Sequence, residues 1–422
     1  MRGGIVSLQF GSALVLARIL GPAEFGVYAL MWSSTLIGAA LISAGAPNYL
    51  LRELPARRAL GLVALPTWPT LRLVAAVPVL LAALFVAALT VAEPVWPAQW
   101  PEAGQSRLVI IAALAYHFIS CQSMLFRVHI GPSTGMMVRD AVPHILLLAA
   151  GAITLRTGNP SATNLIAIFA GLSFGANVML LAVLWRGTGL RLSREAPPFR
   201  PGVTAFWANG AFGALTANLD IVLAGVLFAP QSVGVYAIVK RLGNFVSLPQ
   251  VIANCTAATM IAEAHARVDM RALQNGCLRG LKVALAPAIA FAVLIYALLP
   301  FWARLFAIPY TEALSILALV IIAGNLVNVL FGATFIVASQ CGFEARALSV
   351  RVVTTVFLVV AALGCDLFGE VSPILLALFW SASIVLTNAL LWRTLYTELL
   401  VDTSVWALAR RRGARLARTP VS

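Results

Sequence analysis

The chain contains the same short motif twice, about half its length apart. Residues 17–30 read ARILGPAEFGVYAL, and residues 225–238 read GVLFAPQSVGVYAI. Each copy consists of an apolar run, a small residue, Pro, three variable residues, Gly-Val-Tyr-Ala and a second apolar run. Two apolar runs joined by such a turn predict a helical hairpin, so the sequence predicts two hairpins of one design.

The composition is that of a membrane protein. Of the 422 residues, 61% are hydrophobic and only 10% are charged, whereas a soluble domain is about one quarter charged. A helix needs about 20 apolar residues to cross a bilayer. Twelve apolar runs approach this length and predict an all-α polytopic membrane protein of about 12 transmembrane helices: 4–21, 26–46, 73–93, 107–126, 141–156, 163–185, 204–228, 235–259, 283–303, 312–337, 349–367 and 373–393.

The positive charges predict the orientation of these spans. With the N-terminus inside, most of the 29 Lys and Arg residues fall in cytoplasmic segments, and only Arg18, Arg107, Arg156 and Arg304 fall on the opposite side. Because positive residues resist translocation, this bias predicts that both termini are cytoplasmic. The same bias explains the net charge of +14 without a nucleic-acid partner.

The motif also predicts how the spans are grouped. Pro22 aligns with Pro230 and Gly26 with Gly234, which maps the first two spans onto the seventh and eighth. Six spans separate the copies, so both halves have the same polarity, as in the parallel repeats of alternating-access transporters. The predicted organisation is an N-lobe of six transmembrane helices at 1–185, a cytoplasmic linker at 186–203, a C-lobe of six transmembrane helices at 204–396 and a basic cytoplasmic tail at 397–422.

The two hairpins resemble those of a known family. ARILGPAEFGVYAL, followed by LLRELP at 50–55, is similar to the start of Wzx-type oligosaccharide flippases, and NLDIVLAGVLFAPQSVGVYAIVKRL at 218–242 is similar to their seventh and eighth spans. These are polysaccharide-export proteins of the multidrug/oligosaccharidyl-lipid/polysaccharide (MOP) superfamily. The resemblance implies two six-helix lobes, related by a parallel pseudo-two-fold axis, that face each other across a central cavity.

The resemblance also implies a function. Proteins of this family move undecaprenyl-pyrophosphate-linked oligosaccharides from the inner to the outer leaflet by alternating access. The chain is then expected to be a flippase of the bacterial plasma (inner) membrane and not an enzyme. Its expected partners are the lipid-linked anionic oligosaccharide, membrane lipids, a polysaccharide polymerase and glycosyltransferases.

Three charged residues stand out inside predicted spans, because a charge at a helix centre costs at least ~2.5–3.5 kcal/mol and normally marks function. Asp220 precedes the turn of the second hairpin, and Lys240 and Arg241 follow it at a similar depth, so an ion pair or a shared anion site is expected. Asn209 and Thr216 share a helical stripe with Asp220, and Asn244 shares one with Lys240.

The repeat provides a comparison for these charges. The positions that correspond to Asp220, Lys240 and Arg241 in the first half are Ser12, Trp32 and Ser33. Because the first hairpin is predicted to fold without the charges, a role in function is favoured over a buried pair that only stabilises the lobe.

Four further residues are candidates for the substrate cavity. Arg18 and Arg52 bracket the first hairpin, where a guanidinium could bind a pyrophosphate or extend to the membrane interface. Asn325 and Asn328 share one face of a span and could bind sugar hydroxyls, although hydrogen bonding between helices is the commoner role of such residues. His117 and His144 are candidates for proton relay or for satisfied polar groups.

Other classes of function are disfavoured or left as alternatives. The chain has no P-loop and no zinc-like cysteine spacing, so no cofactor or metal is expected. The alternatives are a cation-coupled multidrug exporter, whose cavity should be acidic, and a lipid II flippase, which usually has two further spans. A polysaccharide polymerase or ligase is less favoured, because the longest predicted external loop is 92–106.

Overall fold

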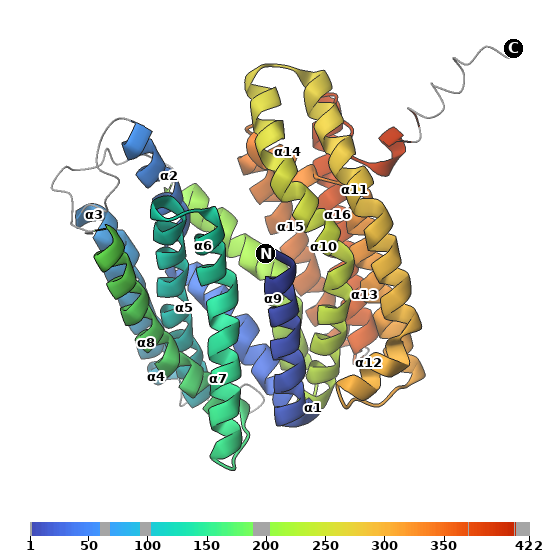
Figure 1. Ribbon diagram of the computed structural model, residues 1–422. Coiled ribbons are helices and arrows are strands. Elements are labelled where there is room, and N and C mark those ends of the chain that lie inside the picture. Colours follow the sequence, from blue (N-terminus) through green and yellow to red (C-terminus); the bar gives the residue numbers. More distant parts are fainter. Residues whose placement is uncertain are drawn as a thin grey trace, which may run out of the picture. The chain divides into compact units, whose positions relative to one another are not determined.

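The computed structural model describes residues 2–59, 68–92, 103–188, 203–369, 371–408 and 410. These residues are almost entirely helical and contain no strand (Figure 1). Ten of their helical segments are long and apolar enough to cross a membrane. The protein is therefore an all-α, multi-pass membrane protein, as the composition predicts.

The chain forms two compact units, Met1–Gly234 and Val235–Ser422, and the division falls inside the helix α10. The helices of the first unit are α1 (Arg2–Ile42), α2 (Ala46–Ala59), α3 (Trp68–Leu71), the π-helix η1 (Arg72–Ala76), α4 (Val77–Ala92), α5 (Ala103–His129), α6 (Pro132–Met136), the π-helix η3 (Met137–Ala141), α7 (Val142–Arg156), α8 (Ala162–Thr188) and α9 (Val203–Leu227). Those that follow are α10 (Pro230–Ala266), α11 (Met270–Ala297), α12 (Leu299–Leu305), α13 (Glu312–Leu330), α14 (Thr334–Gln340), α15 (Glu344–Leu367) and α16 (Pro373–Glu398).

The described residues of the twelve predicted spans are mostly helical, and residue 93 lies outside the described part. Two of the twelve spans are not separate membrane-capable segments. The runs 4–21 and 26–46 share α1, and the run 235–259 lies in α10, which is not among the ten membrane-capable segments. Its polar residues, such as Lys240, Arg241 and Gln250, lower the hydropathy of α10.

The first copy of the motif forms a sharp turn inside α1. Gly21 has φ 73° and ψ 170°, a conformation that residues with a side chain rarely adopt, and two helical legs meet there. Pro22 opens the second leg, as Pro230 opens α10, and proline is well suited to the first turn of a helix. Figure 1 shows α1 doubling back at this turn. The predicted hairpin is confirmed.

The two copies of the motif pack directly against each other. A Cβ atom added to Gly26 would overlap the carbonyl oxygen of Pro230, and one added to Gly234 would overlap the carbonyl oxygen of Pro22. The contact is reciprocal, because each glycine backbone lies against the carbonyl group of the other copy's proline. Only glycine permits this approach at both positions. The repeated Pro-x-x-x-Gly is thus the contact surface between the two copies.

In each unit a few helices make contact with several others: α1 in the first unit, and α13 and α16 in the second. In the first unit, α1 packs against α5, α7, α8 and α9. In the second, α13 packs against α11 and α16, and α15 packs against α16. Because α9 packs on α1, the first compact unit ends at Gly234, whereas the predicted N-lobe ends at residue 185. The predicted lobes follow the sequence repeat, and they stay a prediction. Residues 189–202 of the predicted linker, and residues 409 and 411–422 of the predicted tail, lie outside the described residues.

We expect Gly26→Ala and Gly234→Ala each to destabilise the protein by about 1–3 kcal/mol, because the new methyl group must push two backbones apart. Thermal unfolding of the detergent-purified protein measures this loss. Gly11→Ala is the matched control, because a Cβ at Gly11 would meet nothing within 4 Å. Wild-type unfolding temperatures for both variants would contradict the close contact.

Candidate functional site

The second unit contains a buried cation. The side chain of Lys240 is 4% exposed, and its Nζ atom lies 5.2 Å from the ring centroid of Trp380. Lys240 belongs to α10 and Trp380 to α16, so the contact joins two helices. A cation–π contact contributes about 2 kcal/mol when it is desolvated. The ring therefore offsets part of the cost of placing an ammonium group among apolar helices.

The equivalent position in the first unit is filled by an aromatic side chain instead. Trp32 is buried and makes an edge contact with Phe169 of α8, with ring centroids 5.2 Å apart. Tyr28, Tyr116 and His144 also contact the Trp32 ring. α8 and α16 are the last membrane helices of the first and second halves. Each half therefore uses its last helix to place an aromatic ring against the equivalent hairpin position, Trp32 or Lys240. Packing of the hairpin accepts a tryptophan there, so the charge of Lys240 is not a requirement of the fold.

The predicted carboxylate is also buried. Asp220 of α9 is 0% exposed, whereas Asn209 and Thr216 of the same stripe are half-buried. The Thr216 hydroxyl donates to the carbonyl of Phe212 in its own helix, at 2.9 Å. Asp220 lies in the first unit and Lys240 and Arg241 in the second, so the structure describes each in its own surroundings. Their expected shared site stays a prediction.

The remaining predicted arginines and Asn244 differ in exposure. Arg18 of α1 and Asn244 of α10 are exposed, and Arg241 is half-buried. Arg52 lies in α2, and its side chain is outside the described part of the structure. Arg18 and Arg241 each take part in polar or ring contacts. Their roles in substrate binding stay predictions.

Asn325 and Asn328 belong to a hydrogen-bond network between α10, α13, α14 and α16. The Ser247 hydroxyl donates to Asn325 Oδ1, and Asn388 Nδ2 donates to Asn328 Oδ1 at 2.8 Å. Thr334 in turn donates its hydroxyl hydrogen to Asn388 Oδ1 at 2.7 Å. The structure therefore shows these amides in the interhelical role, which was the alternative, and their sugar-binding role stays a prediction.

The network has members that the sequence pattern did not single out. Gln250 Nε2 donates to the carbonyl oxygens of Asn328 and Gly332, and Asn328 Nδ2 donates back to Gln250 Oε1 at 3.3 Å. Gln250 lies one turn after Ser247, on the polar stripe of α10. Continuing that stripe by one turn is the sequence signal that identifies it.

Both candidate histidines have defined partners. His117 is fully buried and donates its Nε2 hydrogen to the carbonyl of Val74, at 2.9 Å. His144 Nδ1 lies 2.9 Å from the hydroxyl of Ser12, the residue that corresponds to Asp220. The described residues contain no group of three or more His, Cys, Asp or Glu that could hold a metal ion.

Comparison with known proteins identifies the fold. No protein-family model matches the chain, and no curated protein sequence matches it. Among solved structures, it is similar to an inward-facing MATE-family multidrug resistance transporter of the MOP superfamily, with TM-score 0.65 and 13% identity over 99% of this chain and 96% of that one.

Two further solved structures extend this likeness beyond multidrug transporters. One is the lipid II flippase MurJ in an inward closed conformation, with TM-score 0.62 and 11% identity over 93% of this chain and 86% of that one. The other is a MOP superfamily transporter from Pyrococcus furiosus, with TM-score 0.60 and 13% identity over 93% and 90% of the two chains. At these identities the likeness concerns the fold alone: the chain has the helical fold of MATE transporters and of MurJ.

Proposed function

We propose that this protein is a flippase that moves a lipid-linked anionic oligosaccharide, such as a polysaccharide repeat unit on undecaprenyl pyrophosphate, from the inner to the outer leaflet. The observation that carries the proposal is the cationic pair of α10, Lys240 and Arg241, of which Lys240 is buried against Trp380. The fold supports it, because MOP-fold proteins include flippases and exporters.

A pyrophosphate group cannot enter hydrocarbon without compensation. Removing an ion from water costs several kcal/mol even after the protein relaxes around it. Fixed cations offset this cost for an anion, and a guanidinium such as that of Arg241 binds phosphate through two parallel hydrogen bonds. An inside-negative membrane potential then favours outward movement of the anion, by about 2.3 kcal/mol per unit charge for each 100 mV.

A multidrug exporter is the competing proposal, since several neighbours in fold are MATE transporters. Its mostly cationic substrates would be repelled by Lys240 and Arg241. The transporter from Pyrococcus furiosus is described as having a binding pocket of reverse polarity that suggests a different function. By the same reasoning, the cations Lys240 and Arg241 favour an anionic substrate for this chain over a cationic drug. A lipid II flippase, as MurJ is named, stays the nearer alternative because it would need the same cations.

We infer that the protein lies in the bacterial inner membrane with both termini in the cytoplasm. The orientation follows from the distribution of Lys and Arg in the sequence. Glycosyltransferases on the cytoplasmic side would supply the substrate, and a polysaccharide polymerase on the outer side would consume it. Membrane lipids are the remaining partners.

Lys240→Met is expected to reduce surface polysaccharide at least about tenfold, because losing the cation removes about 1.4 kcal/mol or more of anion stabilisation. The measurement is surface polysaccharide in cells that depend on this protein, with the amount of inserted protein determined in parallel. Lys282→Met is the matched control, since Lys282 is exposed and is the only other lysine in the chain. Normal polysaccharide in Lys240→Met, Arg241→Ala and the double variant would exclude the cationic site.

Trp380 provides a second test, because it positions Lys240. Trp380→Phe keeps an aromatic face under the ammonium group and should retain most transport, whereas Trp380→Leu should lose it to a degree similar to Lys240→Met. Surface polysaccharide per inserted protein is again the measurement. Equal activity of the Phe and Leu variants would show that the ring does not support the function of Lys240.

A further inference from the structure

The chain does not leave the second unit when the last membrane helix ends. After α16, it reverses at Leu400, whose φ is +55°, and runs back against the unit. Four consecutive residues, 401–404, are then buried, with exposed fractions of 1%, 6%, 0% and 0%. A segment after a last helix is usually exposed and poorly ordered unless something holds it. We call residues 399–408, with Arg410, the C-terminal strap.

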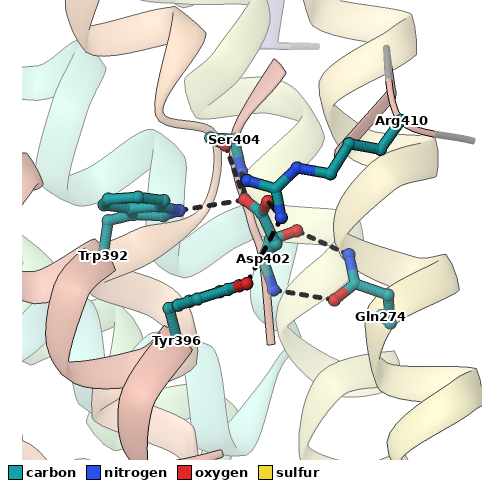
Figure 2. A network of polar contacts seen from close by, with 6 residues as sticks. All are labelled: Gln274, Trp392, Tyr396, Asp402, Ser404 and Arg410. Carbon is teal, nitrogen blue, oxygen red and sulfur yellow. Dashed lines mark hydrogen bonds and ion pairs between the residues drawn. The ribbon is translucent and has the colours of Figure 1, made fainter. Parts of the chain in front are cut away.

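The strap is attached to α11 through its backbone. The N–H of Asp402 donates to Gln274 Oε1 at 2.8 Å, and Gln274 Nε2 donates to the carbonyl oxygen of Asp402 (Figure 2). One side-chain amide therefore pairs with both backbone groups of one strap residue, as a neighbouring strand would.

The strap is attached to α16 through the carboxylate of Asp402. Its Oδ1 atom accepts hydrogen bonds from Trp392 Nε1 at 2.9 Å and from the backbone N–H and the hydroxyl of Ser404 (Figure 2). Arg410 lies on the other oxygen, with Nη1 3.7 Å from Oδ2, and also donates to the hydroxyl of Tyr396 at 3.3 Å. Asp402 is thus the residue on which the strap's contacts converge.

The strap also fills a break between two helices. α13 ends at Leu330 and α14 begins at Thr334, and Gly332 between them has φ +70°. A broken helix leaves carbonyl groups that need other partners inside a membrane protein. The hydroxyl of Thr403 donates to the carbonyl of Phe331 at 2.9 Å. The carbonyl of Thr403 lies so close to Gly332 that a Cβ there would overlap it.

We propose that the C-terminal strap is a clamp that joins α11, the α13–α14 break and α16 into one rigid body and stays docked throughout transport. This rests on the proposed function, because alternating access by rigid-body rocking requires helices that move together. Its consequence is that the conformational change occurs outside this group of helices, and that Asp402 acts as a positioning residue.

Hydrogen–deuterium exchange of the full-length protein in nanodiscs tests the clamp without any substrate. Asp402→Ala and Gln274→Ala should raise the exchange rate at least tenfold in residues 401–404 and at the 331–334 break. Asp402→Asn keeps an oxygen that accepts from Trp392 and Ser404, so it should restore most of the protection. Arg346→Ala, which breaks the exposed ion pair with Glu398 (3.3 Å), is the control and should leave exchange unchanged.

Wild-type exchange in both Asp402→Ala and Gln274→Ala would overturn the clamp, whatever the protein transports. If Asp402→Ala does not insert, Gln274→Ala carries the same test, because it leaves the carboxylate and its three donors in place.

A photo-crosslink tests whether the strap stays docked. The Trp406 ring lies 6.1 Å from Phe331 and 6.4 Å from Trp392, so a photoreactive phenylalanine in place of Trp406 should couple the strap to the unit. Cells that carry the crosslinked protein should keep their surface polysaccharide. Loss of polysaccharide only after irradiation would mean that the strap must release and would overturn the proposal. Normal surface polysaccharide in cells that lack this protein would contradict the proposed function instead.

Discussion

The architecture depends on a backbone contact between two glycines and two prolines. Gly26 lies against the carbonyl of Pro230, and Gly234 lies against the carbonyl of Pro22, so each copy of the motif supplies what the other needs. A single methyl group at either glycine would separate the two turns. The contact explains why the chain repeats Pro-x-x-x-Gly, whereas the apolar runs on either side need only be helical and long enough to span the bilayer.

The positions at which the two copies differ are where the proposed function resides. Trp32 lies in an aromatic cluster, while the corresponding Lys240 lies under Trp380. Ser12 bonds to His144, while the corresponding Asp220 is a buried carboxylate. The first half shows that the hairpin packs without a charge at the positions equivalent to Asp220 and Lys240. Burying the charges of the second half costs free energy, and packing of the hairpin does not require them. We propose that the cations among them bind an anion.

The spans, the first hairpin and the buried charges could be predicted from the sequence, because each depends on local composition or on the repeat. The partners of polar residues could not. Asn328 bonds to Gln250 and Asn388, and these pairings depend on how three helices are rotated against each other. Asp402 follows the last apolar run, where a polar residue suggests a solvated tail, and only the fold brings it to Gln274. Long-range contacts of this kind leave no periodic signal in one sequence.

The most direct test of the central claim is translocation by the purified protein in proteoliposomes. A pyrophosphate-linked oligosaccharide on a polyprenyl lipid should cross the bilayer, and its rate should rise when the compartment that it leaves is made electrically negative. A cationic fluorescent dye should not be transported under the same conditions. Transport of the dye, without transport of the lipid-linked saccharide, would contradict the account and favour a multidrug exporter.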